Sequence, residues 1–307
     1  MRRHLPKRAA TTLAIVSVVV LVSGCEAQVW GTPPDAETTP QATVAAPQAS
    51  LPAPPQAPPA QSAFDGLDAR IRQATADAAE SGADLQTAVL DRNTGQIVSN
   101  RANTPFPIAS VVKLFIADDL LLQVSEGTTQ LSPADRTSLD LMLRSSDDSA
   151  AQNFWDRGGG NAIIARVKAR YGLAGTTAPS NGHWDVTTST ASDLVRYYDM
   201  LLDGSGGLPR EQANVIIGNL AKSTPTGTDG YPQRFGIPEG LYAEPVAVKQ
   251  GWFCCWSGGN QLHVSTGVIG PDRRFVMAIS SLDPTSDAAA RENITQAVKT
   301  MFPSGKI

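Results

Sequence analysis

The sequence predicts a mixed α/β (α+β) fold, in which one antiparallel sheet is flanked by terminal helices and carries an inserted helical lobe. Two strand patterns, at residues 85–90 and 96–99, come early in the chain, and three more come only near its end. The late strand patterns cover residues 245–249, 262–269 and 275–281. Between the two groups apolar residues recur mainly at helical spacing, so the lobe is predicted at about residues 130–205.

Helices are predicted on either side of this sheet and at the start of the lobe. Residues 64–80 repeat apolar residues at helical spacing until a Ser-Gly pair ends the pattern. Residues 91–95 read Asp-Arg-Asn-Thr-Gly and predict a turn between the first two strands. Residues 110–124 form a strongly apolar helical pattern, and a last amphipathic helix covers about residues 285–301.

Composition and charge exclude several classes of protein. The 307 residues are 41% hydrophobic and 18% charged, which excludes a collagen, a coiled coil and a polytopic membrane protein. The net charge is −4, and an acidic chain without a basic run is a poor nucleic-acid binder. Three cysteines exclude a disulfide framework and a four-cysteine zinc site. We expect no cofactor, no metal and a monomer.

The N-terminus is typical of an exported bacterial lipoprotein. A basic start precedes an apolar stretch at residues 9–22, which is shorter than the roughly 20 residues that a bilayer requires. The Leu21-Val22-Ser23-Gly24-Cys25 segment resembles a lipobox, which predicts a signal peptide over residues 1–25 and a lipid on Cys25. We therefore expect anchoring at the extracytoplasmic face of the cell membrane. The alternative is an incidental cysteine after a plain signal peptide, and the start also resembles a twin-arginine signal.

The next segment differs sharply in composition from the rest. Residues 26–62 contain nine prolines and no lysine or arginine. Such a segment cannot bury enough apolar surface to fold, and proline stiffens it, so we expect a disordered tether. Residues 63–307 remain for one large domain.

A Ser-x-x-Lys motif stands at Ser110-Val111-Val112-Lys113. On a helix these two side chains share a face, and the helix N-terminus favours negative charge developing on the serine oxygen. A partly buried lysine can lose its proton and serve as the base for the serine. The alternative is an N-capping serine with a lysine at this spacing by chance.

Two further motifs follow, Ser146-Asp147-Asp148 before a helical pattern and Lys249-Gln250-Gly251 at the end of a strand pattern. With the Ser-x-x-Lys motif they resemble the signature of the penicillin-recognising serine enzymes, the class A β-lactamases and D,D-peptidases. Residues 106–109, 185–188 and 268–272 are also similar to segments of this family. The resemblance implies a β-lactamase/transpeptidase-like fold from about residue 64 to the C-terminus.

The resemblance also implies a role for each matching residue. Ser110 would be acylated, Lys113 would accept its proton, and Ser146 would pass a proton to the leaving group. Lys249 would orient substrate and hold Ser146, and the backbone N–H groups of Ser110 and Trp252 would form an oxyanion hole. The residues expected to bind substrate are Asp148, Gln250, Gly251, Trp252 and His263.

Three departures from the family's pattern affect this interpretation. Asp148 replaces an asparagine, so a carboxylate stands where an amide would donate to the substrate carbonyl. Gln250 replaces the small hydroxyl residue that binds the substrate carboxylate. Residues 173–185 contain no glutamate, whereas class A β-lactamases use one there to activate water for deacylation. Asp185 resembles the aspartate that closes this loop.

Two features near the last motif keep alternatives open. His263 stands about where many class A enzymes place an anion-binding arginine, and the alternative is a partly exposed strand histidine. Cys254 and Cys255 are either a vicinal disulfide or two separate thiols. The aromatic residues around them are either a wall of the substrate site or core.

Two functions are consistent with these observations. One is a lipid-anchored serine acyl hydrolase that works through an acyl-enzyme on Ser110 and turns over β-lactams slowly or not at all. Its ligand would be a peptidoglycan peptide, an ester or a β-lactam. The other is a non-catalytic envelope lipoprotein that uses the same cleft to bind cell-wall material or a partner.

Overall fold

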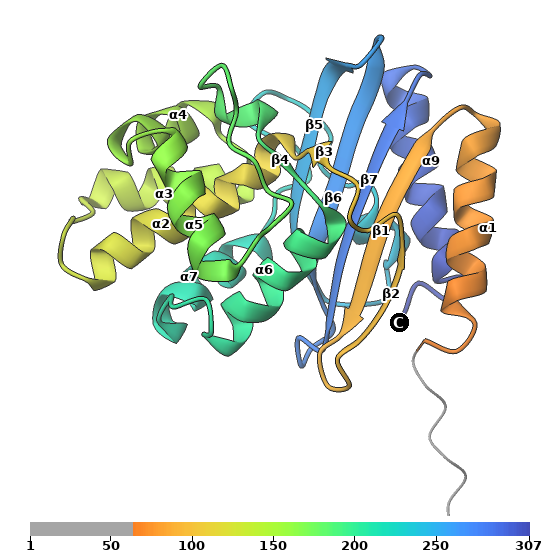
Figure 1. The fold of residues 1–307 in the computed structure, drawn as a ribbon, viewed down its shortest axis with the longest axis horizontal. Coiled ribbons are helices and arrows are strands. Elements are labelled where there is room, and N and C mark those ends of the chain that lie inside the picture. The colour runs from red at the N-terminus through yellow and green to blue at the C-terminus, as the bar shows by residue number, and fades with distance from the viewer. Residues whose placement is uncertain (1–63) are drawn as a thin grey trace, which may run out of the picture. The chain divides into compact units, whose positions relative to one another are not determined.

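The computed structural model describes residues 64–307, coloured along the chain in Figure 1. The signal peptide expected over residues 1–25, the lipid site Cys25 and the tether expected over residues 26–62 lie outside the described residues. Within residues 64–307, no helix combines the length and the apolar character needed to cross a membrane.

A five-stranded antiparallel sheet forms the centre, with the strand order β2-β1-β7-β6-β5. The strands are β1 (Asp84–Asp91), β2 (Gln96–Asn100), β5 (Val246–Trp256), β6 (Asn260–Ile269) and β7 (Phe275–Asp283). The pairing of β1 with β7 joins the early strands to the late ones, as the sequence predicts. The β5 strand is an edge of the sheet and runs well past its predicted end at residue 249, to Trp256. A separate pair is formed by β3 (Phe106–Pro107) and β4 (Thr188–Ser189).

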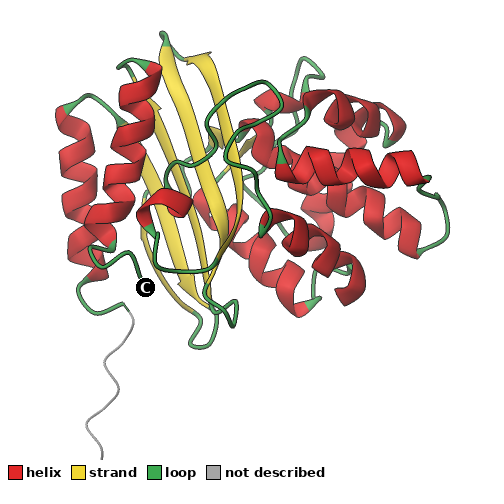
Figure 2. Cartoon of the chain, turned by 180° about the vertical axis from the view of Figure 1, so that it is seen from behind, coloured by secondary structure: helices red, strands yellow, loops and turns green. Residues whose placement is uncertain are grey.

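Helices cover both faces of the sheet (Figures 1 and 2). On one face lie α1 (Leu67–Glu80), α9 (Asp287–Met301) and the short α8 (Ile237–Gly240), and on the other lies the helical lobe. Successive side chains of a strand point to opposite faces, so each strand serves two cores. In β1, Val89 belongs to the core under α1 and α9, whereas Ala88 and Leu90 belong to the core of the lobe.

The lobe contains most of the helices. They are the 3₁₀ turn η1 (Ala109–Val112), α2 (Lys113–Ser125), α3 (Pro133–Arg144), α4 (Asp148–Arg157), α5 (Asn161–Tyr171), η2 (Trp184–Val186), α6 (Ala191–Asp203) and α7 (Arg210–Leu220). The lobe therefore extends past its predicted end near residue 205, because Ala213, Ile216 and Ile217 pack a further helix into the same core. Buried residues cover almost the whole circumference of α2, the central helix, which explains its continuous apolar sequence.

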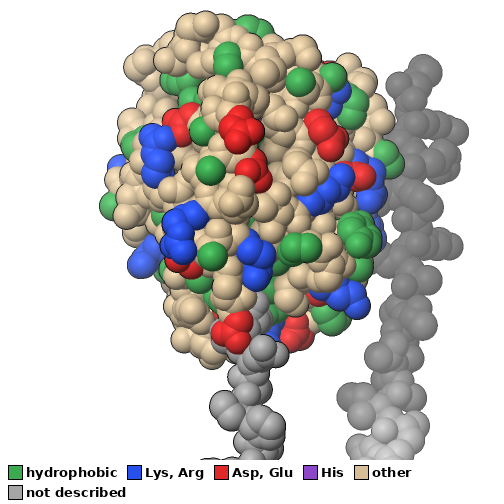
Figure 3. All heavy atoms as spheres, turned by 90° about the vertical axis from the view of Figure 1, so that its right-hand side faces the viewer, with side chains coloured by type: hydrophobic (Ala, Val, Ile, Leu, Met, Phe, Trp, Pro, Cys, Tyr) green, Lys and Arg blue, Asp and Glu red, His purple; other side chains and the backbone are tan. Residues whose placement is uncertain are grey.

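The outer surface near α1 and α9 carries charges of both signs. Figure 3 shows acidic and basic side chains interspersed on this face, with hydrophobic side chains scattered singly among them. Arg72 and Asp68 of α1, for example, form an exposed ion pair one helical turn apart. This face thus lacks the single-sign field that would steer a highly charged partner.

Candidate active site

The three sequence motifs meet where the edge strand β5 passes η1. The Nζ atom of Lys113 donates to the Oγ atom of Ser110 at 2.8 Å and to that of Ser146 at 3.1 Å. The Nζ atom of Lys249 donates to the same Ser146 Oγ atom at 2.9 Å. Two hydroxyls and two amines, which come from η1, α2, the loop before α4 and β5, therefore form one connected chain of hydrogen bonds.

Local backbone features hold these groups in place. Ala109 and Ser146 both adopt left-handed conformations, with φ values of 45° and 58°, which are costly for residues other than glycine. Asp147 caps α4 by accepting a hydrogen bond from the backbone N–H of Ala150 at 2.7 Å. The cap starts the helix at Asp148 and directs Ser146 back toward the two lysines.

Gly251 allows β5 to approach the turn that carries Ser110. A Cβ atom added at Gly251 would lie 2.5 Å from the carbonyl oxygen of Ile108 and 3.3 Å from the backbone nitrogen of Ser110. Backbone atoms of two segments cannot yield as a flexible side chain can. Glycine at this position is therefore a packing requirement of the site.

Both lysines are removed from solvent, and burial changes their protonation. The side chain of Lys113 is fully buried, and this burial lowers its pKa, whereas the carboxylates of Asp148, Asp147 and Asp229 act in the opposite direction. Burial lowers the pKa of Lys249 well below its usual value, and the positive charge of Lys113 lowers it further. Each amine can thus lose its proton at a lower pH than an exposed lysine can.

Asp148 makes an ion pair that an asparagine could not make. Its Oδ1 atom lies 2.5 Å from the Nζ atom of Lys113, and its own side chain remains 69% exposed. The carboxylate competes with the Ser110 hydroxyl for the lysine's hydrogens and stabilises the charged form of Lys113. The departure from the family's pattern at this position therefore acts directly on the candidate base.

A pocket of about 450 Å³ opens over Ser110. Its lining residues are Ala109, Ser110, Asp148, Gln152, His183, Trp184, Asp185, Asp229, Trp252 and Phe253. Three of these lining residues are aspartates. Among residues 64–307, no lysine or arginine lines the pocket. The exposed lining of the pocket is thus acidic, while the two lysines lie buried beneath it.

The loop without glutamate contributes an aromatic side chain to the pocket. The Trp184 ring lies 4.8 Å from the Nζ atom of Lys113, and its Nε1 atom donates to Gln152 at 3.1 Å. Asp185, at the end of this loop, also lines the pocket. Thr176 ties the start of the loop to α6 by donating to the carboxylate of Asp193 at 2.8 Å.

Gln250 and His263 do not line the pocket, contrary to the expectation that they bind substrate. Because Gly251 faces η1, its neighbour Gln250 faces the other side of the sheet and donates to the carbonyl oxygens of Gln233 and Phe235. His263 is 1% exposed, and its Nε2 atom lies 2.6 Å from the hydroxyl of Tyr231. Burial lowers the pKa of His263 to about 4, so the ring is neutral near pH 7.

The aromatic residues after Gly251 serve both as core and as pocket wall. The indole of Trp252 stacks on Tyr231 with ring centroids 4.7 Å apart, and its Nε1 atom donates to Asp229 at 3.2 Å. Phe253 points to the lobe and also lines the pocket. Just beyond them, Cys254 and Cys255 are joined in a disulfide, the first of the two alternatives that the sequence left open.

The motifs did not identify every residue of the pocket. Gln152 follows Asp148 by four positions, so it lies on the same face of α4 and could have been found by helical spacing. Asp229 lies in a loop far from each motif in sequence and carried no such signal. His183 and Trp184 belong to the loop at residues 173–185, where the sequence pattern indicated only that a glutamate is absent.

Comparisons with known proteins agree with this fold. A family model described as "Beta-lactamase enzyme family" matches residues 67–136. Among solved structures, a β-lactamase from Chitinophaga pinensis superposes with a TM-score of 0.63 at 15% identity, covering 78% of this chain and 100% of that one. A PBP-A variant, solved as an acyl-enzyme complex with penicillin G, superposes with a TM-score of 0.64 at 19% identity, covering 78% and 96%. These likenesses show the fold.

Full-length relatives show the family. The chain is 56% identical over 315 aligned residues to the protein named "Putative lipoprotein LppW" in Mycobacterium tuberculosis, and the alignment covers 99% of this chain and 100% of that protein. The Mycobacterium bovis protein of the same name matches equally well. The chain therefore belongs to the LppW family, and it adopts a β-lactamase/transpeptidase-like fold.

Proposed function

We propose that the protein is a lipid-anchored serine acyl hydrolase that works through an acyl-enzyme on Ser110. One observation carries the proposal: Ser110, Lys113, Ser146 and Lys249 are joined by hydrogen bonds of 2.8, 3.1 and 2.9 Å in a buried, connected chain. A serine in contact with a buried amine has the arrangement that nucleophilic catalysis requires.

The first half-reaction follows from this chain. Neutral Lys113 accepts the proton of the Ser110 hydroxyl while Oγ attacks the acyl carbon of the substrate. The backbone N–H groups of Ser110 and Trp252 bind the oxygen that becomes negative in the tetrahedral intermediate. When the intermediate collapses, the proton returns from Lys113 through Ser146 to the leaving group. Lys249 holds the Ser146 hydroxyl in position for this transfer.

The second half-reaction, attack of water on the acyl-enzyme, is expected to be slow. The loop over the pocket carries Trp184 where the family's β-lactamases use a glutamate-bearing loop to activate water. Lys113 holds the Oδ1 atom of the Asp148 carboxylate, so that oxygen is not left to accept a proton from water. A β-lactam acyl-enzyme should therefore persist rather than turn over rapidly.

The charge of the pocket favours substrates without a carboxylate beside the reacting bond. Asp148, Asp185 and Asp229 line the pocket, and the two side chains expected to bind a substrate carboxylate, Gln250 and His263, face the opposite side of the sheet. An anionic penicillin is repelled by this lining. We therefore favour an ester or a peptide over a β-lactam as the natural substrate.

The lipid anchor is part of the same proposal. The relatives are named lipoproteins, and Cys25 stands at the end of a lipobox-like segment. A lipid on Cys25 would tether the domain to the extracytoplasmic face of the cell membrane, where peptidoglycan peptides are accessible.

A second function is favoured by the contact between Asp148 and Lys113. A permanent ion pair would keep Lys113 charged and leave Ser110 without a base, and the cleft would then bind a ligand without chemistry. In that case the protein would be a lipoprotein of the cell envelope that binds a ligand without reacting with it.

Covalent labelling distinguishes the two functions. The full-length protein in neutral detergent is incubated with a fluorophosphonate or with a penicillin, and its intact mass is measured for the wild type and for Ser110→Ala. The hydrolase predicts an adduct that maps to Ser110 and is absent from the variant. Ser125→Ala changes an exposed serine on the neighbouring helix and should keep the adduct. Folded wild-type protein that forms no adduct with either reagent supports the binding function instead.

A further inference from the structure

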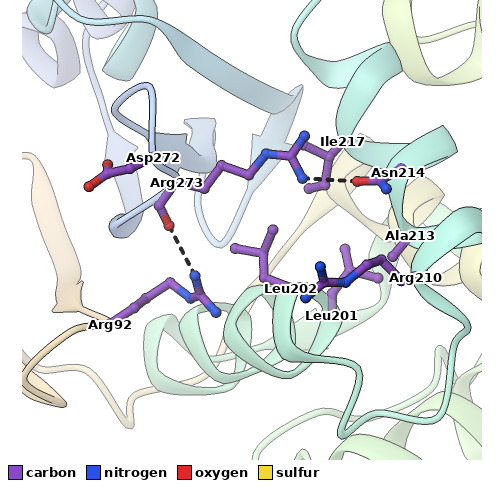
Figure 4. Close-up of a pocket in the computed structure, with 9 residues that line it drawn as sticks. All are labelled: Arg92, Leu201, Leu202, Arg210, Ala213, Asn214, Ile217, Asp272 and Arg273. Atoms are coloured by element: carbon purple, nitrogen blue, oxygen red, sulfur yellow. Dashed lines mark hydrogen bonds between the residues drawn. The ribbon is translucent and has the colours of Figure 1, made fainter. Parts of the chain in front are cut away.

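A second pocket, of about 420 Å³, is separate from the candidate active site and shares no lining residue with it. It lies between the helices α6 and α7 and the turns that follow β1 and β6. Three arginines line it, Arg92 from the first turn, Arg273 from the second and Arg210 from the start of α7 (Figure 4). Three segments that are distant in sequence thus bring their cations to one cavity.

The positive charge of this pocket is only partly compensated. Arg92 pairs with Asp199 at 2.8 Å and donates to the carbonyl oxygen of Arg273. Arg273 donates to the amide oxygen of Asn214 at 2.9 Å but has no carboxylate within ion-pair distance among residues 64–307. Arg210 has no side-chain partner in the described part of the chain. Asp272 is the one acidic residue of the lining, and its carboxylate accepts the backbone N–H of Arg274.

The arrangement of the donors suits a tetrahedral oxyanion. A guanidinium presents five N–H donors in a planar fork, and most of those on Arg210 and Arg273 remain unused within the described residues. One guanidinium can donate to both oxygens of a carboxylate, whereas a phosphate group offers several oxygens that point in different directions. Arginines that approach from three sides, as Figure 4 shows, match the second geometry better.

Leucine and isoleucine side chains form the apolar part of the lining. Leu201 and Ile217 are 1% and 3% exposed and belong to the core of the lobe, whereas Leu202 is partly exposed. A bare inorganic ion would leave Leu202 uncovered. An organic group attached to the anion would cover it and gain the free energy of apolar burial.

We propose that this pocket binds a phosphate ester whose organic part is apolar. The phosphate oxygens accept hydrogen bonds from Arg92, Arg210 and Arg273, and the organic part packs against Leu202. A soluble phosphate ester and the headgroup of an anionic phospholipid share this chemistry. The site is independent of the function proposed for Ser110.

Titration calorimetry of the full-length protein in neutral detergent tests the proposal. The probes are inorganic phosphate, phenyl phosphate and a short-chain phosphatidylglycerol. We expect saturable binding of at least one ester, tighter than that of inorganic phosphate and weakened by added salt. Preference for phenyl phosphate identifies a soluble ester, and preference for phosphatidylglycerol identifies a lipid headgroup.

Matched double variants locate the binding. Arg210→Gln with Arg273→Gln removes two cations of the pocket and should weaken ester binding about tenfold or more. Arg72→Gln with Arg136→Gln removes two exposed cations elsewhere and should leave the affinity unchanged. Thermal unfolding of each variant verifies that it is folded. Equal losses in the two double variants, or binding no tighter than that of inorganic phosphate, would overturn the proposal.

Discussion

The Oδ1 atom of Asp148 lies 2.5 Å from the Nζ atom of Lys113. The same Nζ atom donates to the Ser110 hydroxyl at 2.8 Å. One amine therefore serves a carboxylate and a candidate nucleophile at once. Burial lowers the pKa of Lys113, and the Asp148 carboxylate raises it. The balance of these two effects decides how much neutral Lys113 is present to accept the serine proton.

Asp148→Asn should accelerate labelling of Ser110 by a neutral fluorophosphonate. Removing the carboxylate lowers the pKa of Lys113 further, so the neutral base becomes more abundant at pH 7, and we expect a rate increase of about tenfold or more. The rate should rise with pH through the pKa of Lys113, and its midpoint should move to lower pH in the variant. Labelling rates measured by intact mass across a pH series give both quantities.

Asp229→Asn is the matched control for this variant. It removes another carboxylate from the same pocket, but Asp229 hydrogen-bonds to Trp252 and raises the pKa of Lys113 less than Asp148 does, so the profile of this variant should move by less. Since the reagent carries no charge, repulsion from the lining has no part in the comparison. An Asp148→Asn profile that coincides with the profile of the wild type would contradict the assignment of Lys113 as the base.

Gly251→Ala should damage the site and the stability together. The added methyl group would lie 2.5 Å from the carbonyl oxygen of Ile108 and would push β5 away from the turn that carries Ser110. We expect a loss of about 1–3 kcal/mol in the free energy of unfolding. A displacement of this kind can slow labelling about 100-fold. Urea unfolding and labelling rates test these two effects.

Gly218→Ala provides the comparison, because a Cβ atom there would meet no atom within 4 Å apart from its chain neighbours and the backbone of its own helix. Gly218 lies inside α7, so alanine should stabilise the protein by about 0.5–1 kcal/mol. If Gly251→Ala were tolerated equally well, the close approach of β5 to η1 would not be needed.

His263 should make the stability depend on pH in a defined window. The pKa of its buried ring is about 4, against 6.5 for an exposed histidine, so between these values the unfolded chain binds a proton that the native protein does not. The free energy of unfolding therefore falls as the pH falls through this window, by up to about 1.4 kcal/mol per pH unit. Asp287, Asp283 and Arg291 are the charged groups that act on the ring.

The contribution of His263 is isolated by comparison with His263→Gln, which can still hydrogen-bond to Tyr231. Urea unfolding of both proteins at intervals from pH 7 to pH 4 gives the difference between their stabilities. Between pH 7 and pH 4 we expect the wild type to lose about 3 kcal/mol more of its free energy of unfolding than the variant loses. A difference that stays constant would show that the histidine takes up its proton at the same pH in the native and unfolded proteins, so that burial does not lower its pKa.

Asp118→Asn should be strongly destabilising. The buried carboxylate pairs with Arg170 and accepts a hydrogen bond of 2.5 Å from the Tyr171 hydroxyl. Removing its charge leaves a largely buried guanidinium without a counterion, which costs about 3–5 kcal/mol. Asp68→Asn disrupts the exposed ion pair with Arg72 and should cost about 0.5 kcal/mol or less. Urea unfolding of both variants gives the two values, and equal losses would show that burial is not the cause.

Local patterns predicted much of the fold. The five strands and the terminal helices follow from periodicity within short windows, and η1 with α2 covers the predicted helix at residues 110–124. The helix α7 and the extension of β5 to Trp256 were not predicted. In the second case the added residues are stabilised by pairing with β6, which no local pattern reveals.

The candidate site was predicted in part for the same reason. Ser110 and Lys113 stand three positions apart on adjoining helical turns, so their contact is a local property. The orientation of Gln250 depends on which face of β5 meets η1, and that is decided by the contact of Gly251 with Ile108. The burial of His263 depends on Tyr231, a residue 32 positions away.

By itself the sequence determined the class of the fold, the order of its elements and the three motifs that carry the family resemblance, because each of these is written in residues close together along the chain. Only the tertiary structure decided that Asp148 pairs with Lys113 across 35 positions and that three arginines from separate segments line one pocket. Contacts of this kind form when distant segments pack, and their chemistry follows from the burial and distances that packing imposes.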